Sequence, residues 1–142
     1  MSIGACSDDE PTPVISESEY LTEVTALCER YLPALDEARE ELTAGPFSDA
    51  EAVAYYRSDL VPRLRSILRG LRRNGVPASE TIVDGINSAA AALQDIEDDP
   101  AGLIDRSRDG NLRDEENPFL ELSDGLTQAR ITCAIQPEGF EV

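Results

Sequence analysis

The sequence predicts an all-α protein, and three observations carry this prediction. Apolar residues recur at the i, i+3, i+4 spacing of an amphipathic helix in four separate segments. Two Ser-x-x-Glu capping boxes, Ser16 with Glu19 and Ser48 with Glu51, mark positions at which helices begin. The alternation of apolar and polar residues that would indicate a strand is not seen.

Four helices are predicted, at about residues 16–43, 48–73, 79–97 and 118–131. Pro33 and Pro62 lie inside the first two, where a proline removes a backbone hydrogen bond and should kink the helix. Each helix is too short to be stable alone, so the four apolar faces must be buried against one another. We therefore predict an up-down bundle of four helices, two of them kinked by proline.

The remaining segments are predicted to be non-helical. Residues 1–16 form an acidic, proline-containing tether, and residues 17–142 form the helical bundle domain. A loop is expected from Pro100 to about Asn117, where the last helix begins. Gly85, in the middle of the third helix, should cost about 1 kcal/mol relative to alanine.

Charge and composition restrict the function. The 142 residues carry a net charge of −17, all twelve basic residues are arginine, and histidine, lysine and tryptophan are absent. Such a surface repels nucleic acids and anionic lipid headgroups, and it favours cationic partners or serves solubility alone. Without histidine or lysine, Ser-His-Asp triads and Schiff-base chemistry are excluded. We predict a protein that is not an enzyme and does not bind nucleic acid.

The N-terminus carries a short motif, Ile3-Gly4-Ala5-Cys6, that resembles the lipobox of bacterial lipoproteins. In that motif an aliphatic residue and two small residues precede the cysteine that is lipidated. The polar residues after Cys6 resemble the tether that follows such a cysteine. The resemblance implies a lipid on Cys6 and export to the cell envelope.

Taken whole, the chain resembles small exported actinobacterial lipoproteins of unassigned role, through Cys6, the segment Leu27–Leu35, the arginine-rich second helix and Cys133. This resemblance implies an exported helical bundle with a Cys28–Cys133 bridge, and no activity. The residues themselves leave two alternatives, a disulfide or two separate buried thiols. We favour the disulfide, because the N-terminus indicates export.

Arg65, Arg69, Arg72 and Arg73 share one face of the second helix by their spacing. This face could bind an anionic polymer or a phosphate-bearing envelope component. Alternatively, the arginines neutralise acidic neighbours. We favour neutralisation because the chain is so acidic.

Residues 105–116 resemble the calcium loop of an EF-hand. The side chains at the spacing of calcium ligands are Asp105, Ser107, Asp109, Asn111 and Glu116. The alternative, which we favour, is a polar surface loop with a turn at Asp109-Gly110. Calcium is the one cofactor that the sequence suggests.

These observations favour a non-catalytic, lipid-anchored protein on the outer face of the cytoplasmic membrane or in the cell envelope. It would bind or scaffold an unknown envelope protein or polymer, and it would touch the membrane only through the lipid on Cys6. One alternative is a calcium-dependent binding module that uses residues 105–116. Another is a cytoplasmic acidic protein with reduced thiols.

Overall fold

The computed structural model describes residues 12–134, and the regular elements in this part of the chain are all helical. In chain order they are α1 (Glu17–Thr43), α2 (Asp49–Tyr55), the π-helical segment η2 (Tyr56–Leu60), α3 (Val61–Asn74), α4 (Glu80–Asp98), α5 (Pro100–Asp109), the 3-10 turn η3 (Asp114–Glu116), α6 (Pro118–Gln128) and the 3-10 turn η4 (Thr132–Ala134). The predicted all-α class is confirmed.

Both predicted capping boxes are present. The Ser16 hydroxyl accepts a hydrogen bond from the Glu19 amide at 3.1 Å, and the Glu19 carboxylate accepts one from the Ser16 amide at 3.2 Å. Ser48 and Glu51 make the same reciprocal pair at 3.1 and 2.9 Å. These bonds satisfy amides that have no partner inside the helix, which is why α1 and α2 begin where the sequence predicts.

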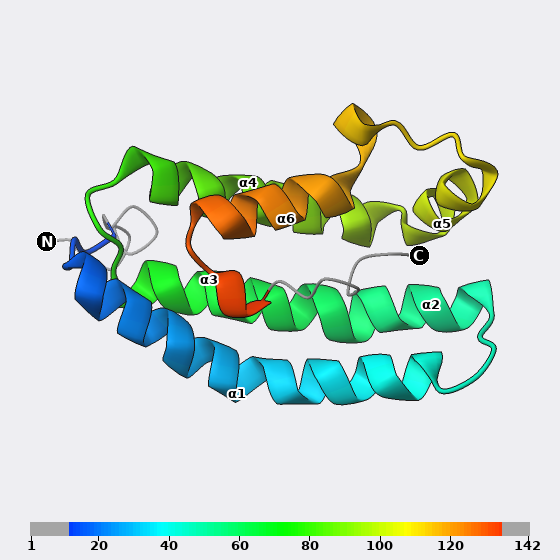
Figure 1. Cartoon of the computed structure of the whole chain (residues 1–142), viewed down its shortest axis with the longest axis horizontal. Coiled ribbons are helices and arrows are strands. Elements are labelled where there is room, and N and C mark those ends of the chain that lie inside the picture. Colours follow the sequence, from blue (N-terminus) through cyan, green and yellow to red (C-terminus); the bar gives the residue numbers. More distant parts are fainter. Residues whose placement is uncertain (1–11, 135–142) are drawn as a thin grey trace, which may run out of the picture.

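The two prolines that are predicted to kink their helices lie in different local structures. Pro33 lies inside α1, which remains one continuous helix whose axis changes direction along its length in Figure 1. Pro62 follows a π-helical turn, in which the Val61 amide donates to the Tyr56 carbonyl, five residues back. Proline has no amide to donate to the carbonyl four residues earlier, and the wider turn lies directly before it. As a result α2, η2 and α3 form one continuous rod.

The predicted loop after Pro100 is wrong for its first ten residues, because these form α5. The Asp99 carboxylate caps this helix by accepting a hydrogen bond from the Gly102 amide at 3.1 Å, and Pro100 takes the first helical position. Leu103 and Ile104 are buried on its inner side. With the rod counted as one helix, the described residues therefore contain five helices rather than four.

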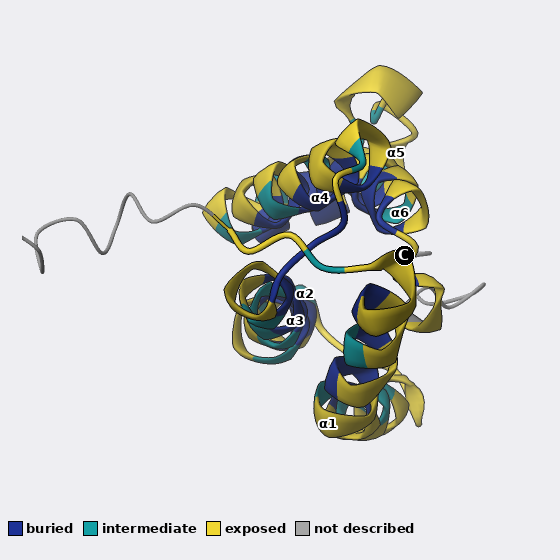
Figure 2. Ribbon diagram, turned by 90° about the vertical axis from the view of Figure 1, so that its left-hand side faces the viewer, coloured by how far each residue is buried: buried dark blue, intermediate teal, exposed yellow. Residues whose placement is uncertain are grey.

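The helices lie in two layers (Figure 1). α1 and the rod of α2, η2 and α3 lie side by side in one layer, and α4 and α6 lie together in the other. Buried residues face the space between the layers, and exposed residues cover the outside (Figure 2). The largest fully buried side chains are Tyr20, Leu60, Leu64, Ile67, Leu68, Leu71, Ile86, Leu93, Ile96, Ile104, Leu122 and Leu126.

α4 and α6 approach each other backbone to backbone at two glycines. A Cβ atom added to Gly85 would lie 2.6 Å from the carbonyl oxygen of Gly125 and 2.6 Å from the amide nitrogen of Ala129. A Cβ on Gly125 would lie 2.7 Å from the amide nitrogen of Ala89. Any larger residue at either glycine would push the helices apart. Close packing therefore explains a glycine that helix propensity alone disfavours.

Candidate functional site: a disulfide junction and a cationic helix end

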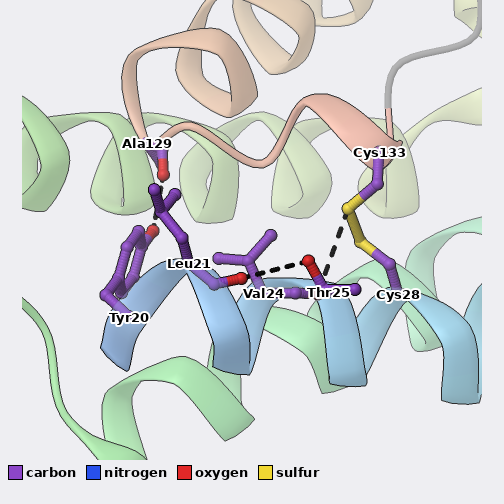
Figure 3. The surroundings of a disulfide bond; sticks show 7 residues. All are labelled: Tyr20, Leu21, Val24, Thr25, Cys28, Ala129 and Cys133. Atoms are coloured by element: carbon purple, nitrogen blue, oxygen red, sulfur yellow. Dashed lines mark hydrogen bonds between the residues drawn. A yellow bond between two sulfur atoms is a disulfide. The ribbon is translucent and has the colours of Figure 1, made fainter. Parts of the chain in front are cut away.

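The end of the described chain is joined covalently to α1 (Figure 3). Cys28 lies on the buried face of α1 with 4% of its surface exposed, while Cys133 lies in η4 and is exposed. Their Cα atoms are 6.3 Å apart, within the usual range for a disulfide, and their sulfurs are bonded. The predicted pairing of Cys28 with Cys133 is confirmed.

The sulfur of Cys133 also touches the backbone of α1. It lies 3.9 Å from the carbonyl oxygen of Val24, the contact that Figure 3 marks with a dashed line. A disulfide sulfur carries no hydrogen, so this contact can become an S–H donor bond only after reduction. The contact with the Val24 carbonyl and the disulfide together hold η4 against the middle of α1.

A buried tyrosine makes a second link between the same two parts of the chain. The Tyr20 hydroxyl donates a hydrogen bond of 2.6 Å to the carbonyl of Ala129, which follows α6 (Figure 3). Burial raises the pKa of Tyr20 to about 12, because the ionised phenolate would lose its hydration. Arg130, which follows Ala129, has a left-handed backbone with φ of 61°, and its side chain forms an ion pair with Glu17 at 3.2 Å. The sequence gives no signal for this link, because Tyr20 fits the apolar face of the first helix and its partner is a backbone carbonyl.

The N-terminal segment leaves the fold at the C-terminal end of α3. The Ile15 amide donates to the Val76 carbonyl, and the Val76 amide donates to the Pro13 carbonyl, both at 3.0 Å. These bonds form an isolated bridge centred on Val14 and Val76. The predicted lipidation site, Cys6, lies outside the described residues.

Residues 105–116, which resemble a calcium loop in sequence, do not have the backbone of an EF-hand loop, because α5 runs to Asp109. α5 carries three of the predicted ligands, Asp105, Ser107 and Asp109. Because residues two apart on a helix point to different sides, these three cannot converge on one ion. The other two, Asn111 and Glu116, follow the helix, with Glu116 in η3. In the part of the chain that the structure describes, no group of three acidic or cysteine side chains is arranged to hold a metal.

One charge from this region instead joins α5 to α2. The Arg108 guanidinium donates hydrogen bonds to both carboxylate oxygens of Asp49, one of them at 3.1 Å. These bonds hold the pKa of Asp49 below its usual value and raise that of Arg108, although both side chains are exposed. The turn predicted at Asp109-Gly110 is present, since Gly110 adopts the left-handed backbone that ends α5.

The predicted arginine face divides into two parts. Arg65 pairs with Glu97 on α4 at 3.3 Å, which is the expected neutralisation of an acidic neighbour. Arg72 donates a hydrogen bond of 2.8 Å to the neutral amide oxygen of Asn87. Arg69, Arg72 and Arg73 are exposed, and none of them forms an ion pair with a carboxylate of residues 12–134.

The rod of α2, η2 and α3, which carries these arginines, contrasts with the rest of the chain. Residues 49–74 contain six arginines and three acidic residues, a net charge of +3 in a chain of −17. In the other layer, a groove of about 510 Å³ between α4, η3 and α6 has four carboxylates in its lining. The lining residues are Ser88, Asp114, Glu115, Asn117, Leu120, Glu121, Asp124, Gly125 and Gln128.

Comparison with protein-family models, with curated proteins and with solved structures finds no match to this chain. Among the helices of residues 12–134, none combines the length and apolar character needed to cross a membrane.

Proposed function

We propose that this chain is an exported, non-catalytic protein that is anchored by a lipid on Cys6 and binds or scaffolds another component of the cell envelope. The observation that carries the proposal is the Cys28–Cys133 pairing. Disulfides persist in oxidising compartments outside the cytosol and are rare where thiols are kept reduced. The partner would be an envelope protein or polymer.

The position of the N-terminal segment supports this proposal. The lipobox-like Ile3-Gly4-Ala5-Cys6 precedes a described chain whose first residues are bonded to Val76. An anchor on Cys6 would therefore hold the domain by one end and leave the helical surfaces free for a partner. The absence of histidine and lysine from the sequence supports a non-catalytic role.

We also infer that the scaffold is the up-down arrangement predicted from the sequence, with α5 inserted between α4 and α6. In support, α1, the rod, α4 and α6 run in alternating directions along the long axis of the molecule in Figure 1. Short connections between antiparallel neighbours are typical of such bundles.

The proposal is tested first at the anchor. Protein expressed from its natural gene, in cells that process lipoproteins, should carry diacylglycerol on Cys6 and fractionate with the membrane. The Cys6→Ser variant is the matched control, and it should be released from the membrane with its fold unchanged. Unmodified Cys6 in the membrane fraction would refute the anchor.

Crosslinking in intact cells then tests the binding role. A partner that co-purifies with the wild-type chain should be lost or reduced with Cys6→Ser, because anchoring places the two together. Thiol titration of the unfolded, unreduced protein completes the test. If Cys28 and Cys133 are found as free thiols in protein from its natural host, the proposed compartment is wrong.

A further inference from the structure

We propose that Arg69, Arg72 and Arg73, at the C-terminal end of α3, contact anionic lipid headgroups when the chain is held at the membrane through Cys6. This inference rests on the proposed anchor and adds a protein surface that meets the bilayer. It concerns one end of the molecule, where three exposed arginines without an ion pair to a described carboxylate lie together in a chain whose net charge is −17.

The reach of the anchor brings this end to the membrane. Cys6 is six residues before Thr12, so a lipid on Cys6 lies at most about 20 Å from the first described residue, even with a fully extended chain. α1 alone, with 27 residues, is about 40 Å long. The end of the bundle that holds Thr12 is therefore kept within about 20 Å of the bilayer, whereas the opposite end, where α1 connects to α2, can lie much farther away.

The three arginines are available at this same end. Arg72 lines a small groove of about 140 Å³ beside Thr12, and its hydrogen bond to Asn87 leaves its charge uncompensated. Arg69 precedes Arg72 by one turn, and Arg73 follows it directly. Arginines in a last turn also stabilise the helix dipole. That role accounts for Arg72 and Arg73, and it leaves their exposed guanidinium groups able to bind phosphate.

Apolar side chains accompany the arginines. Val14, with 71% of its surface exposed, pairs through its backbone with Val76, and Val83, with 37% exposed, lines the same groove as Arg72. Exposed aliphatic groups beside arginines are typical of protein surfaces that rest in the headgroup region. The two valines therefore add apolar contacts that the headgroup region can accept beside the arginines.

The carboxylates of this end define the limits of the surface. Glu19 and Glu23 line a separate groove with Asn74 on the α1 side, away from α4. Glu80 and Asp84 are both exposed on α4, where helical spacing places Glu80 beside Val83 and Asp84 beside Asn87, and they offset part of the arginine charge. Because charges are screened over about 8 Å at physiological salt, these local groups decide the contact, and the distant acidic surface does not.

The test uses the full chain attached to vesicles. The disulfide leaves the thiol of Cys6 for coupling to a maleimide lipid, so the protein can be anchored at its natural position. The sequence has no tryptophan, and therefore Val14→Trp supplies a single reporter at the proposed surface. Leu120→Trp, at an exposed position on α6, supplies a matched reporter elsewhere. The vesicles contain phosphatidylcholine alone or mixed with phosphatidylglycerol, plus a phosphatidylcholine with a nitroxide on its headgroup as quencher.

Quenching of the Val14→Trp reporter should rise about twofold or more on adding phosphatidylglycerol, and salt should reverse the rise. The Leu120→Trp reporter should not respond. Substituting Arg69, Arg72 and Arg73 together by glutamine should abolish the rise. The equivalent triple substitution of Arg106, Arg108 and Arg113, which changes the net charge equally, should preserve it. Thermal melts show whether each variant is folded.

Two results would overturn the inference: equal quenching of the Val14→Trp reporter in both kinds of vesicle, or equal effects of the two triple substitutions. Glu80→Gln provides a further check, since removing this carboxylate should strengthen the response. Coupling through maleimide does not depend on natural lipidation. A negative result in the vesicle experiment would therefore refute the arginine surface and not the lipid anchor. An unmodified Cys6 in the natural host would refute the anchor without deciding the vesicle experiment.

Discussion

Replacing Gly85 by alanine should destabilise the protein, although alanine is the better helix former. The added Cβ would lie 2.6 Å from backbone atoms of Gly125 and Ala129, about 0.8 Å short of the 3.4 Å at which ordinary contact begins. Overpacking costs about 1–3 kcal/mol, and the upper part of this range, about 2–3 kcal/mol, applies here because backbone atoms cannot relieve it by a change of rotamer. Helix propensity returns about 1 kcal/mol. We expect a net loss of about 1–2 kcal/mol, or a fall in Tm of about 3–8 °C.

Denaturant unfolding followed by circular dichroism measures this loss, and Ala91→Gly is the matched control. Ala91 is exposed on the same helix, so its replacement by glycine should cost about 1 kcal/mol through propensity alone. Gly85→Ala and Ala91→Gly, which are opposite changes on the same helix, should therefore both destabilise the protein. A Gly85→Ala variant at least as stable as the wild type would refute the close approach of α4 and α6.

Three further predictions concern the junction, the buried tyrosines and the calcium motif. Reducing the Cys28–Cys133 bond should lower the free energy of unfolding by up to about 4.7 kcal/mol, as expected for a loop of about 100 residues; identical denaturation curves with and without reductant would contradict this. Burial raises the pKa of Tyr20, Tyr55 and Tyr56 to about 12, so the folded state holds their protons more tightly than the unfolded state, and the free energy of unfolding should fall as pH rises from about 10 to 12. Tyrosinate absorbance at 295 nm and the free energy of unfolding should change together. Full ionisation of the tyrosines in the folded protein near pH 10 would count against this prediction. Millimolar calcium should leave Tm unchanged, and calorimetry should show no heat of binding that Asp105→Ala removes, because α5 separates the predicted ligands.

The helix starts were largely predictable, because each is encoded by a few adjacent residues. The serines of the two capping boxes and Asn117 before Pro118 begin helices as expected. Asp99-Pro100 carries the same N-cap signal as Asn117-Pro118, although a loop is the structure predicted from Pro100 onward. It both ends α4 and starts α5, a helix whose two buried apolar residues, Leu103 and Ile104, are too few to reveal a stripe.

Features that depend on contacts between distant residues were harder to predict from the sequence. The pairing of Cys28 with Cys133 could be predicted because only three cysteines exist and one lies in a lipobox-like motif. The Tyr20 bond to Ala129 has no signal in spacing, since the carbonyl belongs to the backbone. The EF-hand spacing of residues 105–116 does not give an EF-hand loop, because a pattern of ligand residues does not fix the backbone. Residues 105–109 have helix-compatible side chains, and a capped helix already leads into them.

The position of the disulfide in the chain has a consequence for biosynthesis. Because an exported chain reaches the oxidising compartment with its N-terminus first, Cys28 arrives there before Cys133, which is 105 residues later. In this sequence Cys6 arrives before both, only 22 residues ahead of Cys28. Pairing of Cys6 with Cys28 would then compete with the native bond, and a lipid on Cys6 would remove that competitor. Early modification of the N-terminus would therefore favour the correct crosslink before the last helix has been exported.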